Sequence, residues 1–156
     1  MNLVPAIVRG RLTEDRADGI LSFWARHGAL EGDAARQRLA EVVAVLVDRG
    51  SGEVVGVNSV YDERVALVGN RRFWLYRRFA PGIPEAIEAA FVNAAFDALE
   101  DEFTPHGPIG LCLRIDDPDL VIRRREAVWP ETDLSYAGYD AAGSQIRIRY
   151  FAGARV

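Results

Sequence analysis

Lysine is absent from this sequence, since all 19 basic residues among its 156 are arginine. A lysine Schiff base and a lysine general base are therefore excluded. Cysteine is nearly absent, because Cys112 is the only one, which excludes a disulfide framework and a multi-cysteine zinc site. This usage predicts a reducing, cytoplasmic setting. The two histidines, His27 and His106, lack a paired metal-ligand spacing, so we expect no metal site.

Long apolar runs and a strong excess of charge are also missing. The N-terminal segment has no basic stretch ahead of an apolar one, and no run approaches the ~18 apolar residues of a membrane helix. We expect neither an export signal nor a membrane span. A net charge of −4 predicts no nucleic-acid partner and no binding to anionic lipid. The hydrophobic share of 49% supports a core, and we expect one domain over residues 1–156.

The N-terminal third combines a strand with two helices. Leu3–Val8 is an apolar, strand-like run. Thr13 precedes two acidic residues, an arrangement typical of a helix N-cap, and this helix is expected to end near Gly28. A second, shorter helix is predicted over Asp33–Ala40.

The middle of the sequence predicts three strands and the most regular helix. Two β-branched runs, Val42–Val47 and Val54–Tyr61, flank a Gly/Ser/Asp tract and indicate a hairpin. Phe73–Tyr76 is a further strand. From Pro84 to Leu99 the apolar residues recur with a period of 3.6, and proline suits the start of a helix.

The C-terminal third predicts a strand, a helix and a hairpin. The strand covers Ile109–Ile115 and the helix extends from Asp117 to about Val128. The hairpin joins Leu134–Tyr139 to Gln145–Phe151. The whole order predicts an α+β fold whose mixed central sheet has about six to seven strands and is flanked by about four helices.

This order of elements, together with the phrase Gly-Glu-Val-Val-Gly at Gly52–Gly56, resembles the GNAT superfamily of acyl-CoA-dependent N-acetyltransferases. The resemblance covers the chain from about Ile7 to Phe151. It implies a GNAT-like fold, acetyl-CoA as the cofactor, and an amine of a small molecule or peptide as the acetyl acceptor.

The resemblance also implies where a coenzyme would bind. In the family, a strand equivalent to Phe73–Tyr76 pairs with the pantetheine arm, and a Q/R-x-x-G-x-G/A loop at a helix N-terminus holds the pyrophosphate. Here Gly82 matches the first glycine, whereas Phe79 replaces the Gln/Arg and Pro84 replaces the second small residue. The cofactor-binding residues implied in this way are Arg78, Phe79, Gly82, Ile83, Glu85 and Ala86.

The charge at this loop opposes phosphate binding. Glu85 and Glu88 place negative charge at the start of the helix, where acids favour the helix dipole but repel an anion. Arg77 and Arg78 lie close by in the sequence and offset that charge. The loop is therefore a degenerate version of the family's loop.

The catalytic residues implied by the resemblance depart from the family in a similar way. GNAT enzymes often use a tyrosine late in the helix after the fifth strand to protonate the leaving thiolate, and Asp117–Val128 contains none. Tyr76 and Tyr136 are the candidate phenols, and Glu63 is the candidate base by its location after the third strand. Trp74 is expected to line a pocket, whereas the other tryptophans are expected in the core.

Two functions remain open from the sequence. One is the transfer of an acetyl group from acetyl-CoA to an amine. The alternative is a GNAT-fold binding or assembly module that no longer binds the coenzyme and no longer catalyses. The C-terminal strand Gln145–Phe151 is expected at a sheet edge, where Arg147 and Arg149 would discourage pairing with a second chain. The alternative is that Phe151 and the Tyr136/Tyr139 hairpin form an exposed apolar patch that marks an interface. The resemblance to GNAT proteins, which are often dimers, favours a homodimer that uses this hairpin.

Overall fold

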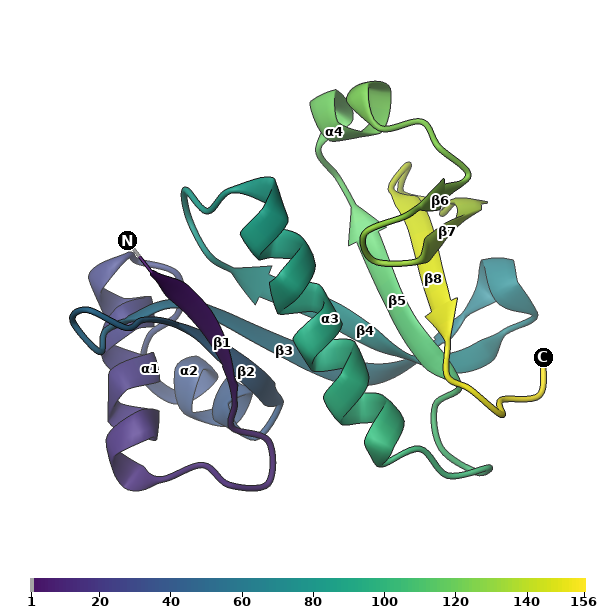
Figure 1. Ribbon diagram of the computed structural model, residues 1–156. Coiled ribbons are helices and arrows are strands. Elements are labelled where there is room, and N and C mark those ends of the chain that lie inside the picture. Colours follow the sequence, from purple (N-terminus) through teal and green to yellow (C-terminus); the bar gives the residue numbers. More distant parts are fainter. Residues whose placement is uncertain (1) are drawn as a thin grey trace. The chain divides into compact units, whose positions relative to one another are not determined.

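The computed structural model describes residues 2–156 and confirms the α+β fold (Figure 1). Four α-helices accompany a sheet with the strand order β1-β2-β3-β4-β5-β8-β7-β6. The sheet has eight strands rather than the six to seven expected. The elements are β1 (Leu3–Ile7), α1 (Glu14–Arg26), α2 (Gly32–Leu39), β2 (Val42–Asp48), β3 (Val54–Val65), β4 (Arg71–Phe79), α3 (Glu85–Asp101), β5 (Gly110–Ile115), α4 (Pro118–Arg123), β6 (Val128–Trp129), β7 (Leu134–Tyr139) and β8 (Gln145–Tyr150).

The described chain divides into two compact units. The first holds the residues up to Val60 together with Arg77–Ala98, and the second holds Tyr61–Tyr76 together with Leu99–Val156. Strands β3 and β4 each contribute residues to both units. The single domain expected over residues 1–156 stays a prediction.

In the first unit, one side of the strands packs against α3, and we call it the α3 face. Its residues include Ala44 and Leu46 of β2, Gly56 and Asn58 of β3, and Ala80, which directly follows β4. Phe91 of α3 is fully buried against this set. A Cβ built on Gly56 would lie 2.8 Å from the Cβ of Ala80, so only glycine fits there. The α3 face is therefore closely packed.

The opposite side of the same strands packs against α1 and α2, and we call it the α1–α2 face. Side chains alternate between the two sides of a strand, so Val45, Val57 and Phe79 lie here. Helix α1 covers them with Phe23 and Trp24, both nearly fully buried. Figure 1 shows α1 and α2 together on one side of β1 and β2. The strands of this unit thus lie between two helical layers.

Local capping explains where two of the helices begin. The hydroxyl of Thr13 accepts a hydrogen bond from the amide of Arg16 at 3.2 Å, which confirms the predicted N-cap of α1. Asp117 caps α4 through the amide of Asp119 at 3.0 Å. Helix α1 ends at Arg26 with His27 as its C-cap, one residue before the expected glycine.

In the second unit, β8 lies between β5 and β7, and this corrects the expectation of an edge strand. Phe151 is 2% exposed, so it forms no surface for a second chain. The homodimer stays a prediction without that support. Tyr136 and Tyr139 are each about half exposed and their rings contact edge to face.

Arg147 of β8 is buried, with 1% of its surface exposed. Its guanidinium donates to Gln145 and to the carbonyl oxygens of Leu134 and Glu126, at 2.8 to 3.2 Å. The same group lies 4.1 Å from the ring centre of Trp129. Neutral acceptors and an aromatic ring thus hold a buried cation.

The helix expected to reach Val128 stops at Arg123. Arg124 leaves the helical conformation and donates to Glu131 at 2.8 Å, while its guanidinium also lies over Trp129. The residues that follow form the short strand β6, which the sequence pattern did not predict.

Candidate functional site

The end of β4 and the start of α3 bring together all six residues implied for coenzyme binding. The strand ends at Phe79, and the turn that follows contains Gly82 at φ +73°, a left-handed conformation that favours glycine. Leaving aside the two chain neighbours of Gly82, none of the described residues has an atom within 4 Å of a Cβ built there, so the turn is open on that side. Helix α3 begins at Glu85, and Pro84 accepts its first hydrogen bond, from the amide of Glu88.

The first turn of α3 carries the charge that the sequence indicated. Nε of Arg78 donates to Glu88 at 2.9 Å, so this arginine is engaged with an acid of the same turn. The second carboxylate oxygen of Glu88 is buried without a hydrogen-bond partner among the described residues. Burial raises the pKa of the Glu88 carboxyl above its ordinary value, although Arg78 acts in the opposite direction.

This turn fits a pyrophosphate through its backbone. The leading amides of a helix have no partner within the helix and form an anion site, and the open space at Gly82 leaves room for the phosphates. Glu85 and the Arg78–Glu88 pair reduce the positive potential there. Gly82, Ile83, Glu85 and Ala86 would hold the coenzyme through main-chain groups, with Arg78 already paired.

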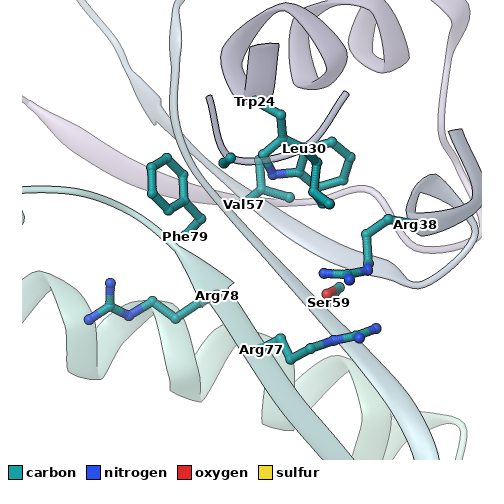
Figure 2. Close-up of a pocket in the computed structure, with 9 residues that line it drawn as sticks. Trp24, Leu30, Arg38, Val57, Ser59, Arg77, Arg78 and Phe79 are labelled. Carbon is teal, nitrogen blue, oxygen red and sulfur yellow. The ribbon is translucent and has the colours of Figure 1, made fainter. Parts of the chain in front are cut away.

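A cavity of about 320 Å³ opens on the α1–α2 face of the same unit, beside the last residues of β4 (Figure 2). Trp24, Leu30, Val57 and Phe79 give it an apolar side. Arg38, Arg77 and Ser59 give it a polar side. The described residues that line it are Trp24, Ala29, Leu30, Arg38, Val57, Ser59, Arg77, Arg78 and Phe79.

Two of the lining arginines share one carboxylate. Nη2 of Arg77 donates to Oε1 of Glu41 at 2.6 Å, and Nε of Arg38 lies 3.4 Å from the same oxygen. In Figure 2 the side chain of Arg78 points away from these two guanidiniums, in agreement with its pairing with Glu88. Phe79 packs its ring against Phe23, with ring centres 5.6 Å apart.

The three candidate catalytic residues lie in the second unit. Tyr76 is 8% exposed on β4, and Tyr136 is 48% exposed on β7. Glu63 is exposed and lies within β3 rather than beyond it, because that strand extends to Val65. None of these three is among the described residues that line the cavity, so their catalytic roles stay predictions.

The tryptophan at the cavity is Trp24, which was expected only in the core. Trp74, expected to line a pocket, is not among the described lining residues. Trp24 serves both purposes, because its ring packs in the core of the first unit and one of its surfaces borders the open volume.

Cys112 is buried in the second unit, whereas His27 lies at a helix end and His106 in a loop. Cys112 is fully buried, and burial raises the pKa of its thiol to about 12, which suits a small apolar residue rather than a nucleophile. His27 contacts Phe23 at the end of α1, and His106 is exposed in a loop. Among residues 2–156 no cluster of potential metal ligands occurs, and no helix there is long and apolar enough to cross a bilayer.

Comparison with solved structures identifies the fold. The chain superimposes on NAA60 of Arabidopsis thaliana, solved with a bisubstrate analogue, with a TM-score of 0.58 and 11% identity, covering 98% of this chain and 100% of that one. A GNAT-family acetyltransferase of Streptococcus agalactiae gives a TM-score of 0.54 at 8% identity, covering 95% of each chain. A structure described as a bacterial toxin gives a TM-score of 0.58 at 11% identity. The match covers 96% of this chain and 91% of that one.

The chain therefore has the fold of the GNAT acetyltransferases, as the sequence resemblance implied. No protein-family model and no curated protein sequence matches it. At this level of identity the likeness defines the fold, and the residues of the chain itself must carry any argument about chemistry.

Sequence reasoning missed the polar side of the cavity. Ser59 interrupts a β-branched strand on the face that carries Val57, which is an available signal for a polar opening. Arg38 and Glu41 follow one another closely around the end of α2, but nothing in the sequence brings them to Arg77, which comes from β4. The fold supplies that third partner.

Proposed function

We propose that this chain is a GNAT-type acyltransferase that takes an acetyl group from acetyl-CoA and passes it to an amine. The observation that supports this proposal is the arrangement around the end of β4. A turn with an open left-handed glycine leads into the N-terminus of α3, and a cavity opens on the other face of the same strand. A helix N-terminus, which is a general type of anion-binding position, and a cavity of about 320 Å³ thus adjoin one strand end.

The chain would contribute to such a reaction mainly by positioning the two reactants. Acetyl-CoA, held by the main-chain groups of Gly82, Ile83, Glu85 and Ala86, would supply the acetyl group as a thioester. Exchange of its C–S bond for a C–N bond to the amine would release one proton from the nitrogen and leave coenzyme A as the thiol. The cavity holds the amine in one orientation and limits the water around it. Water would carry the proton, because none of the three candidates implied by the resemblance, Glu63, Tyr76 and Tyr136, is among the described residues that line the cavity.

The second candidate is a GNAT-fold binding module that has lost the coenzyme. The paired Arg78 and the acidic first turn of α3 favour it, because both lower the affinity for phosphate. The two candidates differ in one measurable property, the binding of acetyl-CoA.

Thermal unfolding with and without acetyl-CoA tests the proposal. A ligand that binds only the native state stabilises it by about 2.7 kcal/mol at 100 times its Kd, so the Tm should rise with acetyl-CoA concentration. No rise up to millimolar ligand would favour the binding module.

Gly82 provides a matched pair of variants for the same measurement. Gly82→Ala and Gly82→Glu share the strain of a side chain at φ +73°, but only the second adds charge where the phosphates approach. We expect the acetyl-CoA-dependent rise in Tm to survive in Gly82→Ala and to vanish in Gly82→Glu. An equal rise in both folded variants would place the coenzyme elsewhere.

A further inference from the structure

The cavity of the first unit changes from apolar to polar along the two strands that form its floor. Strands β3 and β4 are neighbours in the sheet and are joined by the short segment 66–70, as antiparallel strands are. The start of β3 therefore lies beside the end of β4. Val57 and Phe79 lie towards these ends, whereas Ser59 and Arg77 lie two residues further inside on the same side of each strand. The cavity thus has an apolar end and a polar end.

The apolar end determines the size and nature of the ligand's body. Trp24 of α1 and Leu30, which follows that helix, complete this end together with Val57 and Phe79 (Figure 2). At about 320 Å³ the whole cavity is at the lower end of the ~300–1,000 Å³ typical of small-molecule sites. It accommodates one hydrocarbon group of about the size of a phenyl ring with a short polar extension.

At the polar end, Ser59 offers the hydrogen-bonding group. Arg38 and Arg77 both contact the carboxylate of Glu41, and both have further interactions with their neighbours. Ser59 is 3% exposed, and its hydroxyl has no hydrogen-bond partner within residues 2–156. A buried hydroxyl without a partner is costly, and a ligand atom that bonds to it recovers this cost.

The surroundings of Ser59 favour a neutral acceptor on the ligand. A charged group taken out of water needs a partner of opposite charge, and the two guanidiniums at this end are already engaged. Guanidiniums also have no acceptor atom, so a donor on the ligand would find one only in the hydroxyl of Ser59. A carbonyl oxygen, which accepts from that hydroxyl, avoids both costs.

We propose that the cavity binds a neutral carbonyl compound with an apolar body of about the size of a phenyl ring. The body lies against Trp24, Val57 and Phe79, and the carbonyl oxygen accepts a hydrogen bond from the hydroxyl of Ser59. The identification of this compound with the acetyl acceptor rests on the proposed function. Its recognition rests on the cavity alone.

Calorimetric titration without coenzyme tests the recognition with four related probes. Hydrocinnamamide has both the ring and a neutral carbonyl, whereas propionamide lacks the ring, phenethylamine lacks the carbonyl, and hydrocinnamate carries a charge. We expect hydrocinnamamide to bind, and each of the other three to bind about tenfold more weakly or less. No binding of hydrocinnamamide at millimolar concentration, or tighter binding of hydrocinnamate or phenethylamine, would overturn the proposal.

A pair of serine variants connects the binding to this cavity. Ser59→Ala removes the hydroxyl and leaves the apolar end intact, so hydrocinnamamide should bind about tenfold more weakly and lose its advantage over phenethylamine. Ser22→Ala is the matched control, because Ser22 is an exposed residue of α1 in the same unit and is not among the described lining residues. Equal affinity of hydrocinnamamide for the two folded variants would contradict the proposal.

The outcome is separable from that of the proposed function. If hydrocinnamamide binds through Ser59 and acetyl-CoA does not bind, the cavity assignment holds and the acyltransferase proposal fails. If acetyl-CoA binds and hydrocinnamamide does not, the acyltransferase proposal holds and this inference fails.

Discussion

The α3 face and the α1–α2 face of the first unit belong to the same strands, yet the first is closely packed and the second contains a cavity. On the α3 face the residues are small where the helix approaches most closely, as at Gly56 and Ala80, and Phe91 fills the remaining space. On the α1–α2 face, Ser59 and Arg77 take the place of further apolar residues and the packing stays open. Alternation along a strand thus lets neighbouring residues pack closely on one side and line a cavity on the other.

Asn58 and Ser59 are the sharpest test of this comparison, since they are neighbours on opposite faces. The side chain of Asn58 is fully buried, accepts from the amide of Ala44 at 2.8 Å and donates to the carbonyl of Phe91 at 3.2 Å. Asn58→Leu keeps the size but leaves the Ala44 amide without this acceptor, and we expect a loss of about 3 kcal/mol in the free energy of unfolding. Urea denaturation measures it.

Ser59→Ala is the control for that experiment. Its side chain borders the cavity, so removing the hydroxyl creates no new enclosed void, and we expect a change of about 0.5 kcal/mol or less. Similar losses in Asn58→Leu and Ser59→Ala would mean that the two faces do not differ in the way described.

Gly56 tests how tightly the α3 face is closed. The methyl group in Gly56→Ala would lie 2.8 Å from the Cβ of Ala80 and 3.1 Å from that of Leu46, neither of which is the end of a flexible side chain. We expect this overpacking to cost about 1–2 kcal/mol in urea denaturation.

The same substitution at Gly19 should act in the opposite direction. Gly19 lies inside α1, where a Cβ would find Val54 at an ordinary 3.7 Å, so Gly19→Ala should stabilise the protein by about 1 kcal/mol. If Gly56→Ala is also stabilising, the strands and α3 can separate more easily than their packing indicates.

Much of the α3 face could be predicted from the sequence, whereas the cavity could not. The period of 3.6 residues identified α3, and the β-branched runs identified β2 and β3, because those patterns depend on local spacing alone. The cavity depends on which side chains α2 and β4 bring to Glu41, and that is a consequence of tertiary packing.

The errors in the C-terminal part have the same origin. Helix α4 ends early because Arg124 binds Glu131 and Trp129 instead of continuing the helix, and β6 is too short to give an alternating pattern. A charged residue in a strand usually faces solvent, but Arg147 is buried because three hydrogen-bond acceptors and the ring of Trp129 compensate the cost of burial. Local sequence patterns therefore predict helices and strands better than they predict which side chains contact one another.

The smallest expected effect concerns Glu88, the acid at the start of α3. Burial is the main cause of its raised pKa, so the folded state retains a proton on this carboxyl to higher pH than the unfolded chain does. A group of this kind contributes stability that is complete below its unfolded pKa, near 4.5, and is lost as the pH rises through the folded pKa.

Glu88→Gln cannot ionise and does not lose this contribution. The stability of Glu88→Gln relative to the unmodified protein should therefore increase as the pH rises from about 4.5, in urea denaturation repeated across that range. If the stability of Glu88→Gln relative to the unmodified protein falls as the pH rises, the ion pair between Arg78 and Glu88 outweighs burial. The turn then stabilises the Glu88 carboxylate, even though one of its oxygens is buried without a hydrogen-bond partner among the described residues.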